Sequence, residues 1–151
     1  MDIHLSEYNR IFLEKSYFWL NDPILQKNMN INKTITIEDQ ELWYESLPDR
    51  TDYKIWGILF DDKPIGACGF RNIKDNSGEI TIYIGDKEYW GGTGSIVLGL
   101  LEEKAIDLNL KTLFAKILKS NSRSYKLFIN KGFNCCGDNE DFYILKKNIT
   151  L

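Results

Sequence analysis

The first third of the chain spaces its apolar residues with the period of an α-helix. Ser6 is suited to cap a helix over residues 6–20 that stops at Asn21-Asp22-Pro23. The repeating side of this helix carries Ile11, Phe12, Lys15, Phe18 and Trp19. A second helix is predicted over residues 36–47, because Pro48 ends the next helical repeat of apolar residues.

The middle of the chain changes to the composition of β-strands. Aromatic and β-branched residues fill residues 53–60, 64–72 and 79–84, and Asp61-Asp62-Lys63 is a hairpin-type connection, so an antiparallel meander is predicted. The remaining pattern predicts a helix over 95–108, a strand over 112–118, a helix over 122–130 ended by Gly132, and a hairpin of 133–136 with 142–146. A short strand over residues 3–5 is left open.

This order of elements predicts an α/β (α+β) fold in one domain over residues 1–151. The segment from Ile80 to Leu113 contains a helix and is long enough for a parallel crossover. We therefore expect a mixed central sheet of about six to seven strands with flanking helices.

Composition and charge exclude several classes of protein. The 151 residues carry 19 Lys plus Arg against 22 Asp plus Glu, a net charge of −3 without any block of like charge, so no nucleic-acid partner is expected. Cys68, Cys135 and Cys136 lack the spacing of a zinc site or disulfide framework, so we expect no metal and a reducing, cytoplasmic location. No signal-like start and no apolar run of roughly 20 residues occurs, which argues against a membrane partner. A single histidine, His4, argues against Ser-His-Asp or Cys-His catalysis.

The strongest chemical signal is a glycine loop between a predicted strand and a predicted helix. Its residues are Gly91, Gly92, Thr93, Gly94 and Ser95. Glycines let main-chain amides approach a ligand, and a helix N-terminus attracts anions such as phosphate. No lysine follows, as nucleoside triphosphate hydrolysis requires, and the dinucleotide pattern is absent. A glycine turn that only joins strand to helix, or an anion-binding module unrelated to coenzyme A, remains an alternative.

A second segment, residues 121–133, supports a more specific interpretation. Residues 121–133 begin with Asn121 and end with Gly132-Phe133, and together with the glycine loop they resemble the GNAT superfamily of N-acetyltransferases. The resemblance spans about residue 10 to the end. Residues 18–23, the helix with Trp43 and the ending 141–144 are similar to the branch with ribosomal-protein and nucleotide-amino-sugar acetyltransferases.

Two positions depart from the pattern of the family. The family loop has one more residue, which is missing here between Gly91 and Gly92. The family's tyrosine, the expected general acid toward the departing thiolate, falls on Phe128, which cannot donate a proton. A thiol has a pKa near 8.5, so water can protonate the thiolate instead.

The resemblance implies catalytic and cofactor-binding residues. Glu79 is the candidate general base, with an exposed strand-end glutamate as the alternative, and Tyr125 or Tyr83 is a candidate hydroxyl donor, with packing as the alternative. Strands 79–84 and 112–118 are expected to splay apart, so that main-chain groups on the first pair with the amide-bearing arm of the cofactor. The expected cofactor-binding residues are Ile82, Tyr83, Ile84, Gly91, Gly92, Thr93, Gly94, Ser95, Asn121 and Phe128.

Three further residues have two possible roles each. Asn121 either orients the cofactor or caps its helix. Trp19 and Trp43, on the two early helices, either line a pocket for the acceptor or belong to the core.

These residues together predict an acetyl-CoA-dependent N-acetyltransferase in which a primary amine attacks the thioester directly. The resemblance favours a nucleotide-linked amino sugar as acceptor and a protein N-terminus second. A coenzyme A-binding module with impaired catalysis is a third alternative, because of Phe128. The sequence does not determine the oligomeric state, and a homodimer is an alternative to a monomer.

Overall fold

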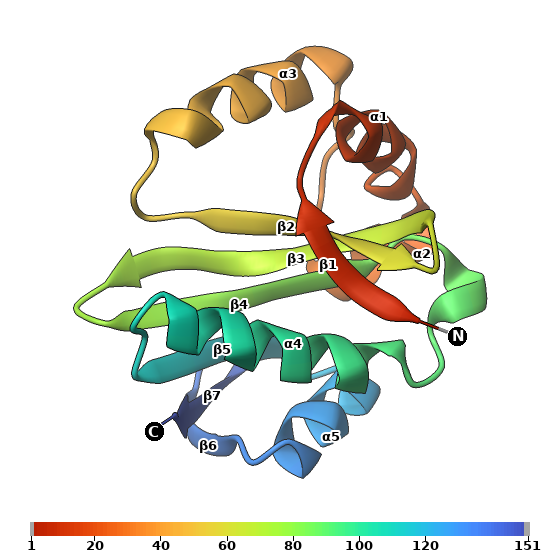
Figure 1. The fold of residues 1–151 in the computed structure, drawn as a ribbon. Coiled ribbons are helices and arrows are strands. Elements are labelled where there is room, and N and C mark those ends of the chain that lie inside the picture. Colours follow the sequence, from red (N-terminus) through yellow and green to blue (C-terminus); the bar gives the residue numbers. More distant parts are fainter. Residues whose placement is uncertain (1, 150–151) are drawn as a thin grey trace.

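A mixed sheet forms the centre of the computed structural model, which describes residues 2–149 (Figure 1). Its seven strands lie in the order β1-β2-β3-β4-β5-β7-β6. Only β4 and β5 run parallel, and all other neighbours are antiparallel. The strands are β1 (Ile3–Glu7), β2 (Lys54–Phe60), β3 (Lys63–Lys74), β4 (Ser77–Ile84), β5 (Thr112–Leu118), β6 (Asn134–Asp138) and β7 (Phe142–Asn148). The predicted fold class is confirmed, including the meander of β2, β3 and β4 and the parallel crossover.

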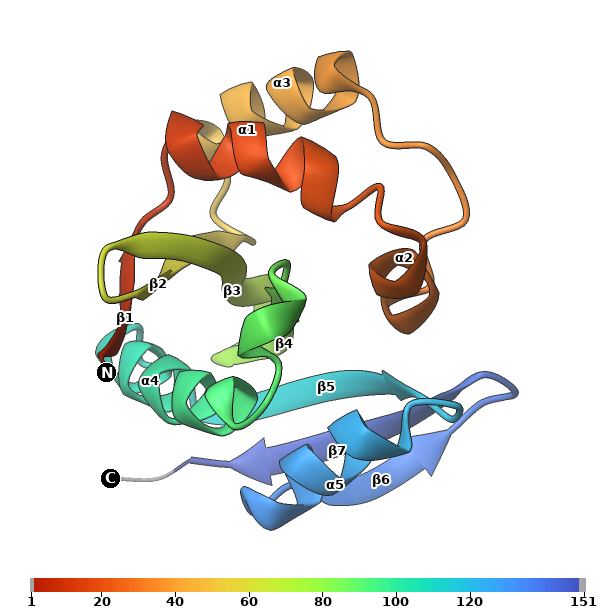
Figure 2. The same ribbon diagram turned by 90° about the vertical axis from the view of Figure 1, so that its right-hand side faces the viewer.

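Helices cover both faces of this sheet, with α1 and α3 on one side and α4 and α5 on the other (Figure 2). The helices are α1 (Arg10–Trp19), α2 (Pro23–Met29), α3 (Ile37–Ser46), α4 (Thr93–Asp107) and α5 (Ser122–Asn130), with 3-10 turns η1 (Leu47–Asp49) and η2 (Lys87–Tyr89). Within residues 2–149, no helix is long and apolar enough to cross a bilayer.

Alternation along the strands divides the core into two clusters. Cys68 and Phe70 on β3 face α4 and α5, where Leu101 and Phe128 are also buried. Ala67 faces the other way, toward Phe12 of α1. Because successive strand residues point to opposite faces, one face of β3 packs against α4 and α5 and the other against α1.

The prediction for the start and the buried side of α1 was wrong. Ser6 belongs to β1, where it pairs with Gly57, and Asn9 caps the helix by accepting from the amide of Ile11 at 3.0 Å. The helix therefore begins later, and of the predicted side Phe12 alone is fully buried, together with Leu13 and Ser16. By contrast, Ile11 and Phe18 are 58% and 74% exposed.

Helix α2 was not predicted, because Asn21-Asp22-Pro23 looked only like a stop. The same residues also start a helix. Pro23 occupies its first turn, where no amide hydrogen is needed, and Asp22 accepts hydrogen bonds from the amides of Ile24 and Leu25 at 2.9 and 3.2 Å.

Candidate active site

The parallel strands β4 and β5 separate along the chain. Their pairing runs only from Ser77 opposite Thr112 to Glu79 opposite Phe114, although β4 continues to Ile84 and β5 to Leu118. On their outer edges the two strands stay paired, with β3 and β7 respectively. Residues 80–84 and 115–118 thus have facing backbone edges that do not pair with each other, and the predicted splay is observed (Figure 2).

The unpaired edges of residues 80–84 and 115–118 form the two sides of an opening, which we call the fork. The glycine loop forms the N-terminus of α4 beside this fork. Gly92 caps the helix with φ of +80°, a left-handed conformation that favours glycine. A Cβ added to Gly91 or Gly92 would meet no atom within 4 Å, so both glycines border open space. No side chain of the described residues caps α4, so its first amides are available to a ligand. This arrangement suits an anion at the positive end of the helix.

Contacts from several elements fix the approach to this loop. Trp90 donates from its indole Nε1 to the carbonyl oxygen of Ile84 at 2.7 Å, and Arg123 donates to the carbonyl oxygen of Trp90 at 3.0 Å. The ring of Tyr89 lies 4.5 Å from that of Phe60. Sequence reasoning missed Arg123, although its place two residues after Asn121 was a usable signal. One consequence is that the carbonyl of Ile84, expected to face the cofactor, already has a partner.

Glu79 lies where β4 and β5 part. Its side chain is 11% exposed and its Oε2 accepts a hydrogen bond from Nε of Arg71 at 2.5 Å. Glu79 and Arg71 are directly opposed in the β3–β4 register. The alternative of an exposed strand-end glutamate therefore does not describe this residue, and the chemistry expected of it remains a prediction.

Trp19 and Tyr83 meet at the end of β4. Their rings are T-shaped at 6.2 Å, on the face covered by α1 and α3. A Cβ on Gly85 would lie 2.1 Å from Cγ of Trp19, so only glycine allows the indole to sit there. Burial raises the pKa of Tyr83 well above its ordinary value.

Trp43 packs against other aromatic rings than Trp19 does. It packs against Tyr8 at 5.4 Å and Tyr53 at 6.1 Å, in the aromatic cluster beneath α3. Burial raises the pKa of Tyr8 to about 12, which marks this cluster as interior. Trp43 is thus a partly buried residue that packs against the cluster of Tyr8 and Phe12, and its role in an acceptor pocket stays a prediction.

Helix α5 and its N-cap carry three more of the predicted residues. Asn121 caps the helix by accepting from the amide of Ser124 at 3.2 Å, as its second predicted role required. Tyr125 packs against Tyr143 at 4.8 Å, and Phe128 is 1% exposed with its ring T-shaped to Phe133 at 5.0 Å. Phe128 is thus a core residue.

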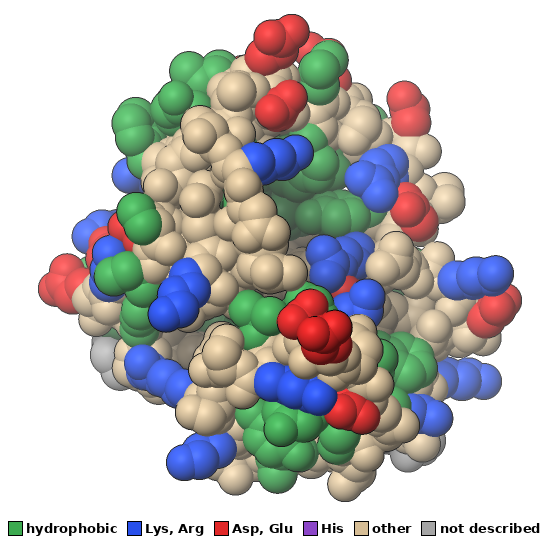
Figure 3. Space-filling model, turned by 180° about the vertical axis from the view of Figure 1, so that it is seen from behind, with side chains coloured by type: hydrophobic (Ala, Val, Ile, Leu, Met, Phe, Trp, Pro, Cys, Tyr) green, Lys and Arg blue, Asp and Glu red, His purple; other side chains and the backbone are tan. Residues whose placement is uncertain are grey.

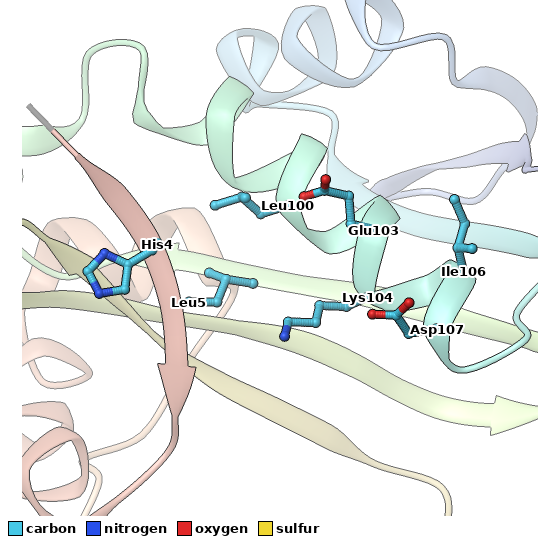
Figure 4. Close-up of a pocket in the computed structure, with 7 residues that line it drawn as sticks. All are labelled: His4, Leu5, Leu100, Glu103, Lys104, Ile106 and Asp107. Carbon is cyan, nitrogen blue, oxygen red and sulfur yellow. The ribbon is translucent and has the colours of Figure 1, made fainter.

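The surface of the molecule is hollowed in more than one place. The face behind the sheet in Figure 1 is hollowed near its centre, with hydrophobic side chains on the floor and charged side chains at the rim (Figure 3). A cavity of about 520 Å³ lies between β1 and the C-terminal half of α4, lined by His4, Leu5, Leu100, Glu103, Lys104, Ile106 and Asp107 (Figure 4). His4 sits on β1, the edge strand, remote from β4 in the strand order. Within residues 2–149, no group of three or more His, Cys, Asp or Glu side chains is arranged to hold a metal ion.

The structure is thus an α/β fold with a fork between parallel strands beside an uncapped helix N-terminus, and comparison with known families gives the class of protein. The model of the acetyltransferase (GNAT) domain family matches residues 7–134, so the chain belongs to this family of acetyltransferases. The predicted family and enzyme class are confirmed.

Individual relatives agree with this assignment. The chain is 27% identical to acetyltransferase PseH of Campylobacter jejuni, over 93% of this chain and 88% of that protein. A crystal structure of a domain from Methanocaldococcus jannaschii has a TM-score of 0.86 and 25% identity, covering 98% of this chain and 99% of that one. The structure of PseH in complex with acetyl coenzyme A has a TM-score of 0.78 and 24% identity, covering 99% and 100%.

Proposed function

We propose that the protein transfers the acetyl group of acetyl-CoA to a primary amine by direct attack of the amine. The observation that carries this proposal is the fork between β4 and β5, which opens next to the uncapped N-terminus of α4 in a chain of the GNAT family. A thioester supplies an activated acetyl group, and the protein then has to bind it, orient it and receive a proton.

The residues at the fork fit acetyl-CoA. Gly91 and Gly92 leave room for phosphate oxygens at the first amides of α4, and the guanidinium of Arg123 lies beside the same loop. The facing edges of β4 and β5 offer amides and carbonyls to a chain that itself contains amides. The binding device is therefore mostly main chain, which suits a protein with net charge of −3.

The general base for the amine is proposed to lie at the fork. An ammonium with a pKa of about 10 must lose its proton near pH 7, which costs roughly 4 kcal/mol. Glu79 stands at the branching point, and we propose that it takes this proton directly or through water. Trp19 and Tyr83 form an aromatic wall on the same face, and we propose that water protonates the departing thiolate, because Phe128 has no hydroxyl and the ring of Tyr125 packs against Tyr143.

Among acceptors we favour a nucleotide-linked amino sugar. This choice is supported by the likeness of residues 18–23 and 141–144 to the sugar-acetylating branch, and by the aromatic wall, since such rings pack against apolar faces of sugars. A protein N-terminus is the second acceptor to be compared.

Two measurements test this function. Acetyl-CoA should raise the melting temperature, since a ligand at 100 times its Kd stabilises a protein by about 2.7 kcal/mol. Thiol release should then appear with one class among amino sugars, polyamines and peptides. Ping-pong kinetics with a burst would contradict direct attack, and absence of any thermal shift would reject acetyl-CoA as the substrate.

Phe128, which has no hydroxyl to donate, supports a second candidate, a coenzyme A-binding module with impaired catalysis. It differs from the first in one result. Acetyl-CoA would raise the melting temperature, but no amine in the panel would cause thiol release.

A further inference from the structure

A row of three polar side chains crosses the sheet on the face covered by α1 and α3. Glu79 of β4 is opposite Arg71 of β3, and Tyr53 directly precedes β2 on the far side of Arg71. Burial raises the pKa of Tyr53, while the charges of Arg50 and Arg71 act to lower it, and Cζ of Arg50 lies 4.7 Å from the centre of the Tyr53 ring. Arg50 is already bound to Asp52 through Nε and Nη2, each at 3.0 Å.

Arg71 holds Glu79 from one side only. The bond joins Nε of Arg71 to Oε2 of Glu79, and the side chains are 48% and 11% exposed. A carboxylate this buried needs a charged partner to remain in place. Arg71 therefore fixes the position of the carboxylate at the fork.

Both members of the pair keep free hydrogen-bonding groups. Within residues 2–149, Oε1 of Glu79 accepts no hydrogen bond, yet it is not among the side-chain atoms sealed from solvent without a partner. The two Nη groups of Arg71 likewise donate to no residue that the structure describes. Since guanidinium has five N–H donors and one is used, the pair offers an acceptor beside several donors.

We propose that Arg71 is a positioning and specificity residue, which holds Glu79 toward the attacking amine and binds an oxygen on the neighbouring carbon of the acceptor. This inference rests on the proposed function and narrows it to amines that carry a vicinal oxygen, as amino sugars do. A site built to donate a hydrogen bond to the substrate discriminates strongly against an analogue without the accepting oxygen. A plain alkylamine would leave the donors of Arg71 without a partner.

Two matched amines test this inference. We would measure kcat/KM of thiol release with trans-2-aminocyclohexanol and with cyclohexylamine, for the wild type and for Arg71→Met, Arg71→Lys and Lys74→Met. Lys74 is an exposed cation on the same strand and serves as the control. The wild type should prefer the amino alcohol by tenfold or more. Arg71→Met should abolish most of this preference, Arg71→Lys should keep part of it, and Lys74→Met should keep all of it.

The ratio of kcat/KM for the amino alcohol to kcat/KM for cyclohexylamine separates a loss of specificity from a general loss of activity. If Arg71→Met does not fold, Arg71→Lys decides, because a lysine ammonium lacks the forked donors and must lower the ratio. Equal use of both amines by the wild type, or an unchanged ratio in the Arg71 variants, would overturn the inference. Thiol release with neither amine by a protein that binds acetyl-CoA would also overturn it. Failure of acetyl-CoA to bind would instead reject the proposed function itself.

Discussion

The indole of Trp90 is bound to the carbonyl oxygen of Ile84, with 2.7 Å between the two atoms. Ile84 ends β4, and Trp90 directly precedes the two glycines at the N-terminus of α4. One hydrogen bond therefore links the fork between the strands to the loop proposed to hold phosphate. The position of the loop relative to the strand is set by a side chain rather than by the glycines.

Replacing Trp90 with Phe should weaken acetyl-CoA binding by about fivefold, since a neutral hydrogen bond contributes about 1 kcal/mol. The measurement is isothermal titration with acetyl-CoA. Trp56→Phe is the control, because Trp56 packs on Phe70 at 5.9 Å, on the body of the sheet. It should lower the melting temperature and leave the affinity unchanged. Equal loss of affinity in both variants would mean that Trp90 acts only through general stability.

Gly92 and Gly99 form a matched pair in the same helix. Gly92→Ala places a side chain at φ of +80° and should cost about 1 kcal/mol of folding free energy, together with acetyl-CoA affinity. Gly99 lies inside α4 with no atom within 4 Å of an added Cβ, so Gly99→Ala should stabilise by roughly 0.5 kcal/mol and leave binding intact. Urea unfolding and titration with acetyl-CoA measure both effects. Unchanged affinity in Gly92→Ala would remove the loop from the proposed phosphate site.

Trp19 and Trp43 should respond differently to truncation. Trp19→Ala is expected to raise KM for the amine several-fold without changing acetyl-CoA affinity, because the indole packs on Tyr83 at the end of β4 and is proposed to border the acceptor. Trp43→Ala should instead cost on the order of 3 kcal/mol of stability, since it opens a cavity beside Tyr8. Steady-state kinetics and urea unfolding separate the two. An effect of Trp19→Ala on stability alone would contradict its place in the acceptor pocket.

The ends of a helix or strand could be predicted from the sequence where nearby residues, such as a helix cap or a glycine, determine them. Asn121 and Gly132 mark α5, and the predicted bounds of α5 and β5 are those observed. The buried side of α1 could not be predicted, since Phe18 is as apolar as Phe12 and only β1, which pairs with β2, sets the rotation of the helix. The ion pair of Glu79 with Arg71 depends on the register of β3 with β4. To predict this ion pair, the full bounds of the β3–β4 hairpin were needed. The strands that the sequence predicted there are shorter than those observed.

Asp22 gives a dependence of stability on pH. The hydrogen bond from Lys87 and the amides of Leu25 and Ile24 lower the pKa of Asp22 below its ordinary value of 3.8. A lowered pKa in the folded state means that the stabilisation is complete above the ordinary pKa and is lost as pH falls through the folded value. Asp22→Asn keeps the helix cap but loses the ion pair, so its deficit in melting temperature should be full at pH 7 and vanish in acid.

Lys87→Met provides the check on this assignment. Lys87 lies 2.9 Å from Oδ2 of Asp22 and starts the turn that leads to the glycine loop. Its effect and that of Asp22→Asn should not add in the double variant, because both remove one interaction. Additive losses, or an Asp22→Asn deficit that persists in acid, would assign the stability to another contact.

Phe128→Tyr tests the departure of the thiolate. A thiol with a pKa near 8.5 leaves without strong need of an acid at neutral pH, so the added hydroxyl should change kcat by less than about threefold. Phe133→Tyr is the control for a hydroxyl added to the same aromatic pair, whose rings are 5.0 Å apart. Thiol release under saturating amine gives kcat for each variant. A gain of tenfold, which corresponds to about 1.4 kcal/mol, in Phe128→Tyr but not in Phe133→Tyr would show that protonation by water limits this enzyme.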